Sequence, residues 1–328
     1  MSLIDLVAQN LLSPAILFFV LGIISGLVKS DLDVPEQISR YLSIYLMMAI
    51  GFKGGVAIAE TADINLKVVL TILAGLLTGF TQPFIGYFLL KWTTKLDRPT
   101  AAAVAAHYGS ISMVTFVTAV SFLESENIIY AGYIVAVLAL MEAPAIFTGL
   151  FIAHREEPRT IEVGEKTAPA LSRDIFTNGA ILLLTASFFI GAITGTEGMV
   201  KMKGFLADPF QGILALFLLD MGLMVSRQVH HMREFTWRIA AFGIYMPLIG
   251  ATLGLCLSSL IGLDVGTATL FTVLIASASY IAVTAAMRLA LPQAKAAIYV
   301  PMSLAITFPF NIIIGIPLYY ACATYFLG

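Results

Sequence analysis

The sequence predicts an all-α polytopic membrane protein with ten transmembrane helices, arranged as two inverted repeats of five. Three observations lead to this prediction. Of the 328 residues, 59% are hydrophobic and 12% are charged, whereas soluble domains are about 45–50% apolar and about 25% charged. The apolar residues form long stretches, and the polar pattern of the first half returns in the second. This composition argues against a water-soluble enzyme, and a net charge of −2 without a basic block argues against a nucleic-acid-binding protein.

Ten apolar stretches are long enough for a bilayer-spanning helix, which needs about 20 residues. They cover roughly residues 13–29, 39–59, 66–91, 99–120, 126–153, 174–195, 210–228, 236–260, 265–289 and 295–325. The longest polar stretch separates the first five from the last five. We therefore expect a first repeat over residues 1–153, a linker over 154–174 and a second repeat over 175–328.

The distribution of Lys and Arg predicts the orientation, because cytoplasmic loops are enriched in these residues. If the N-terminus is outside, 14 of the 18 Lys and Arg residues fall in the inside loops and helix ends, and 3 fall outside. The remaining one, Lys53, lies within an apolar stretch. We expect both termini outside and the linker in the cytoplasm.

The two halves resemble each other when the chain is shifted by about 170 residues. A shift of 167 places Ser110-Ile111-Ser112 on Ser277-Ala278-Ser279, and a shift of 169 places Glu142 on Asn311. Because five is odd, the second repeat must cross the membrane upside down relative to the first. Inverted repeats are typical of secondary transporters, whose sites lie at the midplane between the repeats. The alternative is chance similarity between apolar helices.

Polar and small residues interrupt the fourth and ninth segments at matching positions. The interruptions are AAHYGSISMVTFVTA, around Gly109, and IASASYIAVTAAMR, after Ile275. A broken helix inside a membrane must satisfy its freed backbone groups from protein or a water-filled cavity. Half-helix N-termini carry free amides and partial positive charge, so the pattern predicts a site for a small anion. The alternative is that these residues only allow close helix packing.

A carboxylate deep inside the fifth segment, Glu142, is a candidate site residue because intramembrane charges are costly. Its repeat partner is Asn311, and each lies beside a proline, Pro144 or Pro309, that disturbs the helix and bares a carbonyl. These oxygen ligands favour an alkali cation over a transition metal. Neither a resident cofactor nor a catalytic set is indicated. The alternatives are a protonated structural glutamate and a proton relay.

Two further charges, Lys53 and Asp220, lie in the second and seventh segments, which the repeat pairs with each other. An ion pair would lower the cost of both charges in the membrane. We therefore predict a Lys53–Asp220 pair with a structural or gating role.

Residues 276–294 and 299–320, ASASYIAVTAAMRLALPQA and YVPMSLAITFPFNIIIGIPLYY, closely resemble the second repeat of the sodium-dependent bicarbonate transporters, the SbtA-type permease family. The first half resembles the family more loosely, in GFKGGVAI, YGSIS and MEAPA, where the family has aspartate in place of Glu142. Met113 and Val114 also replace Gly and Ser near the first break.

The resemblance implies a core domain of helices 3–5 and 8–10, a gate or panel domain of helices 1, 2, 6 and 7, and a homotrimer. It implies that helices 4 and 9 cross at their breaks, with bicarbonate and sodium in adjacent places. Carried over, the anion would be held by Ser110, Ile111, Ser112, Ala278, Ser279 and Tyr280. Sodium would be held by Ser112, Thr115, Glu142, Ser277, Ser303 and Asn311. Family members also bind a PII-like cytosolic protein at the inner face.

The expected function is therefore sodium-coupled uptake of bicarbonate across the plasma (inner) membrane. Three alternatives remain open at this point: a sodium/proton exchanger, a sodium symporter of another small anion or carboxylate, and a ligand sensor that uses the same scaffold without transport.

Overall fold

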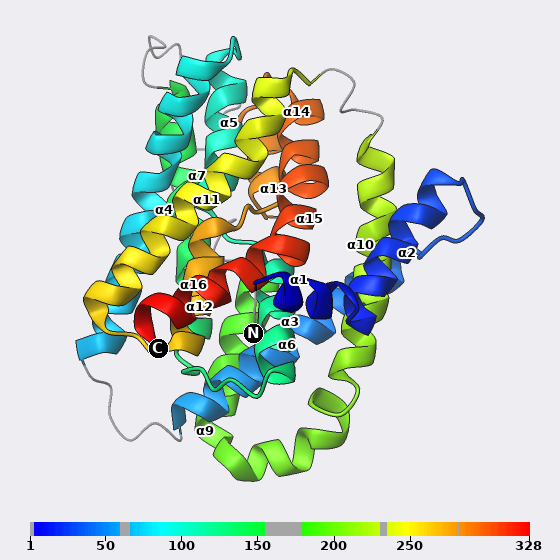
Figure 1. The fold of residues 1–328 in the computed structure, drawn as a ribbon, viewed down its shortest axis with the longest axis vertical. Helices are drawn as coiled ribbons and strands as arrows, with labels where there is room; N and C mark the ends of the chain where they lie inside the picture. Colours follow the sequence, from blue (N-terminus) through cyan, green and yellow to red (C-terminus); the bar gives the residue numbers. More distant parts are fainter. Residues whose placement is uncertain (1–2, 60–65, 155–178, 230–234, 281) are drawn as a thin grey trace.

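The structure is a computed structural model that describes residues 3–59, 66–154, 179–229, 235–280 and 282–328. Every regular element in these ranges is a helix (Figure 1). The first half contains α1 (Leu3–Leu11), α2 (Pro14–Leu27), α3 (Glu36–Ala59), α4 (Leu66–Thr93), α5 (Arg98–Gly109), α6 (Met113–Ser125) and α7 (Ile134–His154). The second half contains α9 (Gly179–Leu206), α10 (Phe210–Val229), α11 (Trp237–Ile261), α12 (Val265–Ala276), α13 (Ala282–Ala290), α14 (Ala296–Pro301), η2 (Met302–Thr307), α15 (Phe308–Phe310), η3 (Asn311–Gly315) and α16 (Ile316–Leu327).

The helices pack in two groups. Helix α2 packs mainly against α10, and α3 packs mainly against α9, while α4, α5, α7, α11 and α12 pack against one another. In Figure 1 the pair α2 and α10 stands to one side of the bundle that contains α4, α7 and α11. Glycines permit the close approach in the first group: a Cβ at Gly22 would lie 2.1 Å from a backbone oxygen of α10, and one at Gly55 would lie 1.9 Å from a backbone oxygen of α9.

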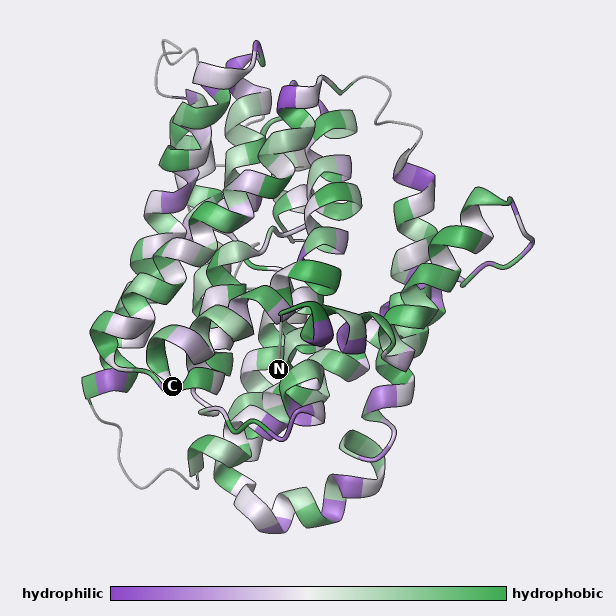
Figure 2. Ribbon diagram, in the orientation of Figure 1, coloured by the Kyte–Doolittle hydropathy of each residue, from purple (hydrophilic) through white to green (hydrophobic). Residues whose placement is uncertain are grey.

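Among the described residues, eight helical segments are long and apolar enough to cross a membrane, and α1 with α2 would make a ninth if the bent pair is one span. Of the predicted segments, only residues 265–289 are not represented in this set, because that segment is divided into the short helices α12 and α13. Figure 2 shows the hydrophilic residues mainly toward the two ends of the bundle, with hydrophobic residues between them. These features indicate a multi-pass membrane protein.

Three element boundaries differ from the predicted segments. A nine-residue amphipathic helix, α1, precedes the first segment and meets α2 at 64°. The fifth segment becomes helical only at Ile134. Element α9 continues past residue 195 to Leu206, but Gly195 has non-helical angles (φ 56°, ψ −151°), so a kink at the predicted boundary separates a second helical stretch from the first. Most of the predicted linker, from residue 155 to 174, lies outside the described residues.

The last segment, residues 296–327, is a helix with two π-helical stretches, η2 and η3. Pro301, Pro309 and Pro317 each remove a backbone donor from this segment. Hydrogen bonding therefore changes register along it, and π-helical turns of this kind are frequent at functional sites. Asn311 is the first residue of η3.

Candidate functional site

The first break separates α5 from α6 at residues 110–112. Asp97 caps α5 by accepting a hydrogen bond from the Thr100 amide at 2.9 Å, and the helix ends at Gly109. Ser110 and Ser112 are extended, with φ values of −100° and −104°. A Cβ at Gly109 would lie 2.3 Å from a ring carbon of Pro83 in α4, so only glycine fits where α5 ends.

The second break, between α12 and α13, repeats this construction. Asp264 caps α12 by accepting from the Thr267 amide at 2.9 Å, the same distance as in the first cap and at the same offset of 167 residues. Ser277 then leaves the helix with an extended ψ of 170°. The residues from Ser277 to Tyr280 are buried. Matching caps and matching breaks are what the inverted-repeat prediction requires of these two segments.

Two hydrogen bonds join the two broken segments. The Ser112 amide donates to Ser277 Oγ at 2.8 Å, and the Ser279 amide donates to the His107 carbonyl at 2.9 Å. Each break supplies the donor of one bond, from Ser112 and Ser279, which the predicted repeat pairs with each other. The first amides of a helix have no carbonyl of their own helix to bond. This contact between residues 110–112 and 277–280, here called the crossing, therefore brings polar backbone and the N-terminal end of α6 into the buried centre of the bundle.

One hydroxyl at the crossing has no protein partner. Ser110 Oγ is buried and makes no hydrogen bond within the described residues. Because a buried polar group without a partner is unfavourable, such an atom is a natural contact for a bound polar ligand. By contrast, the Ser277 hydroxyl is already bonded to the Ser112 amide and to the Leu274 carbonyl.

The predicted sodium ligands are only partly brought together. Thr115 Oγ1 donates to Ser112 Oγ at 2.9 Å. Asn311 reaches the end of α12, where its amide nitrogen donates to the Ala276 carbonyl at 3.0 Å. Ser303 Oγ donates to the Tyr299 carbonyl of its own helix at 3.0 Å. The backbone of Glu142 lies within α7, and its side chain lies outside the described part of the chain.

Two neighbours of the crossing are not among the predicted ligands. Gln82, in the middle of α4, donates to the Ile275 carbonyl at 2.7 Å, and its own side-chain oxygen has no partner within the described residues. His107 bonds the Ala103 carbonyl at 2.6 Å and Thr284 Oγ1 at 3.1 Å, which links the first break to α13. The sequence signal that could have identified Gln82 is a glutamine beside a proline within an apolar stretch, in TQPF.

The predicted ion pair between Lys53 and Asp220 is wrong. Lys53 Nζ lies 3.1 Å from Glu124 Oε1 at the end of α6 and 4.3 Å from the centre of the Phe210 ring. Asp220 lies ten residues beyond Phe210 along α10, which corresponds to about 15 Å at 1.5 Å per residue. The two charges are therefore at different depths, and Lys53 finds its anion on α6 instead.

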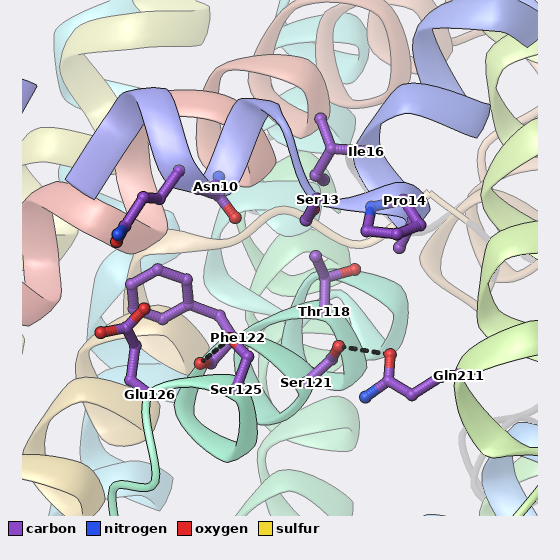
Figure 3. Close-up of a pocket in the computed structure, with 12 residues that line it drawn as sticks. Asn10, Ser13, Pro14, Ile16, Thr118, Ser121, Phe122, Ser125, Glu126 and Gln211 are labelled. Atoms are coloured by element: carbon purple, nitrogen blue, oxygen red, sulfur yellow. Dashed lines mark hydrogen bonds between the residues drawn. The ribbon is translucent and has the colours of Figure 1, made fainter. Parts of the chain in front are cut away.

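A cavity of about 380 Å³ lies beyond the crossing, toward the end of α6. Figure 3 shows Thr118 and Ser121 of α6 opposite Asn10, Ser13 and Pro14 at the bend between α1 and α2. Thr118 lies about one turn along α6 from Thr115, so hydroxyls continue from the crossing to the cavity. Ser121 Oγ also donates to Gln211 Oε1 at 2.9 Å, which connects α6 to α10 across the cavity.

Residues 14–324 match the family model of the Na⁺-dependent bicarbonate transporter superfamily. The chain belongs to this superfamily. The match covers both breaks, the cavity-facing part of α6 and both π-helical stretches, η2 and η3. The resemblance to sodium-dependent bicarbonate transporters is thereby confirmed at the level of the family. No curated protein matches the chain.

Membership in a transporter superfamily agrees with the apolar helices that the fold presents. Sodium and bicarbonate are the species that the family description associates with such transporters. A transport function accounts for the buried polar crossing better than an enzymatic one, because a transported ion needs ligands rather than a nucleophile and a base.

Proposed function

We propose that this chain carries out sodium-coupled uptake of bicarbonate across the plasma (inner) membrane. The observation that carries the proposal is the contact between the two breaks, because it gathers polar backbone, the N-terminal end of α6 and the Ser110 hydroxyl, which has no partner within the described residues, inside a bundle of apolar helices. Amides and hydroxyls suit a small anion. Family membership supplies the choice of bicarbonate.

The anion would be held by Ser110, Ile111 and Ser112 from the first break and by Ala278, Ser279 and Tyr280 from the second. Sodium would lie beside it, held from Ser112, Thr115, Glu142, Ser277, Ser303 and Asn311. Adjacent sites for opposite charges give reciprocal coupling, in which each ion raises the affinity for the other. Asn311, whose amide nitrogen and oxygen are both bonded to protein, would mainly position the end of α12.

Coupling to sodium solves an energetic problem of anion uptake. A negative cytoplasm opposes the inward movement of a monovalent anion by about 2.3 kcal/mol per 100 mV. One sodium ion that moves with the anion cancels this term and adds the free energy of its own gradient. An anion path without a cation partner would work against the membrane potential.

The two packing groups support a core and a panel as the moving parts. We propose that α4 to α7 and α11 to α16 form the core, and that α1 to α3, α9 and α10 form the panel, in ten spans with both termini outside. In this orientation the cavity beside Thr118 opens outward. The cavity would admit ions to the crossing, and movement of the core against the panel would close it.

A homotrimer and a PII-like regulator at the inner face are further parts of the proposal. Both come from the family resemblance. Light scattering of the purified protein in detergent, with the detergent mass subtracted, would measure the first. Co-purification from a cytosolic extract that contains a PII-like protein would measure the second.

The proposal is tested by uptake of labelled bicarbonate into proteoliposomes. We expect uptake when sodium is present outside and loss of uptake when choline replaces it. Uptake of another carboxylate but not bicarbonate would change the substrate. Sodium movement that acidifies or alkalinises the lumen without any added anion would favour sodium/proton exchange, and saturable binding without flux would favour a sensor.

A further inference from the structure

Asp220 is a buried carboxylate that the proposed transport site does not use. It lies near the middle of α10, ten residues after Phe210 and nine before Val229. The residue is only 5% exposed, and Oδ2 makes no hydrogen bond within the described residues. An ionised carboxylate in such a place is unfavourable, because protein hydrogen bonds replace its lost hydration only in part.

The groups around Asp220 do not supply the missing cation. From α3, the Ser39 hydroxyl approaches the carboxylate as a hydrogen-bond partner. Arg227, two turns further along α10, also acts on Asp220, but it bonds Asp33, whose negative charge acts on Asp220 in the opposite sense, and both side chains are exposed. The other ionisable side chains of α3 are the exposed Glu36, Arg40 and Tyr41, Tyr45, which bonds the Phe205 carbonyl, and Lys53, which bonds Glu124. Helix α2 and the η2 segment, which also pack on α10, contain no ionisable side chain, and α14 contains only Tyr299.

The second break also approaches Asp220, through Tyr280. Tyr280 is close enough to interact electrostatically with Asp220, and its hydroxyl donates to Met221 Sδ at 3.7 Å. Asp220 therefore lies where α10 meets the crossing. Movement of the two packing groups against each other would change its surroundings.

The surroundings suit a proton better than a metal cation. A hard cation such as sodium or calcium needs a shell of about six oxygen ligands, whereas the described side chains that act on Asp220 offer two hydroxyls, those of Ser39 and Tyr280. A proton needs one oxygen, and Oδ2 is free to take it. We propose that Asp220 is a proton-binding site, occupied when α10 lies against the second break.

Proton binding at Asp220 has a consequence for transport. This consequence rests on the proposed function, whereas the proton-binding site does not depend on it. Loss of the proton places a charge at the contact between α10 and Tyr280 and so disfavours the arrangement seen here. The equilibrium between arrangements of core and panel, and with it the rate of uptake, would depend on pH through this residue.

Infrared difference spectroscopy of the protein in lipid nanodiscs tests the site directly. At neutral pH we expect a band from a protonated carboxyl group that disappears in Asp220→Asn and persists in the matched control Asp208→Asn, which removes an exposed carboxylate that precedes α10. Full persistence of the band in Asp220→Asn would overturn the proposal. If Asp220→Asn does not fold, carbon-13 labelling of all aspartates in the wild-type protein replaces it, and an unshifted band would assign the proton to a glutamate and overturn the proposal.

The same variants separate the proton site from the transport function. We expect the pH dependence of bicarbonate uptake to flatten in Asp220→Asn and to remain in Asp208→Asn. A lost band together with an unchanged pH dependence would overturn the link to movement. A lost band in a protein that takes up no bicarbonate would leave the proton site standing and refute the proposed function instead.

Discussion

Replacing Ser277 by alanine should destabilise the protein by opening the contact between the two breaks. Ser277 Oγ accepts from the Ser112 amide at 2.8 Å and donates to the Leu274 carbonyl at 3.0 Å. The substitution leaves the Ser112 amide buried without its acceptor, because Ser112 is only 3% exposed. An orphaned buried donor costs about 1–3 kcal/mol, so we expect the free energy of unfolding to fall by about that amount.

Ser258→Ala is the matched control for this measurement. It removes the same atoms from an equally buried position, but Ser258 Oγ has no hydrogen-bond partner within the described residues. We expect its free energy of unfolding to be unchanged or slightly raised, since an unsatisfied polar atom is lost. Denaturant unfolding of both variants in the same detergent gives the comparison. Equal stability of Ser277→Ala and Ser258→Ala would refute the view that the cross-break bond holds the site together.

Three other substitutions test separate parts of the account. Ser110→Ala should leave the unfolding midpoint unchanged, because the Ser110 hydroxyl has no partner to lose within the described residues, and should lower the apparent affinity for bicarbonate in an uptake assay. An unchanged affinity would remove Ser110 from the anion site. Gly55→Ala should lower the free energy of unfolding by about 1–3 kcal/mol, because the added carbon overpacks against α9. Gly204→Ala, whose added carbon has nothing within 4 Å, should leave it unchanged, and equal denaturation midpoints for the two variants would contradict the close packing. Lys53→Glu combined with Glu124→Lys should recover most of the stability that either single charge reversal loses, up to about 1 kcal/mol for this partly exposed pair. A double variant as unstable as the single variants would show that the pair contributes nothing to stability.

The broken helices could be predicted from sequence because their signals are local. Gly109 and the serines on either side of each break mark where a helix cannot continue. Asp97 and Asp264 are residues of the type that begins helices, and each is followed three residues later by the threonine whose amide it binds. Local chemistry of this kind is readable without knowledge of the tertiary contacts.

Contacts between distant segments could not be predicted in the same way. The sequence marks Lys53 and Asp220 as charges in apolar stretches, but it does not give their depths, and Lys53 instead pairs with Glu124. Gln82 finds its partner in a backbone carbonyl that is accessible only because α12 ends there. Both outcomes depend on how helices are placed against one another, which residue type and spacing do not determine.

Helix α1 is not predictable from the pattern of apolar stretches for a different reason. A transmembrane span needs about 20 residues, and α1 has nine. Its role is visible only in the folded protein, where Asn10 donates to the Ile312 and Ile313 carbonyls at 2.7 and 3.2 Å. These carbonyls follow Asn311 in η3, so α1 connects the bend before α2 to the neighbourhood of the proposed sodium site.

Binding of bicarbonate to the purified protein, measured by calorimetry at low and at saturating sodium, tests the central claim most directly. If the two breaks hold anion and sodium in adjacent places, bicarbonate should bind more tightly in saturating sodium, and sodium should bind more tightly by the same factor in saturating bicarbonate. An affinity for bicarbonate that does not change with sodium would contradict a shared, coupled site at the crossing.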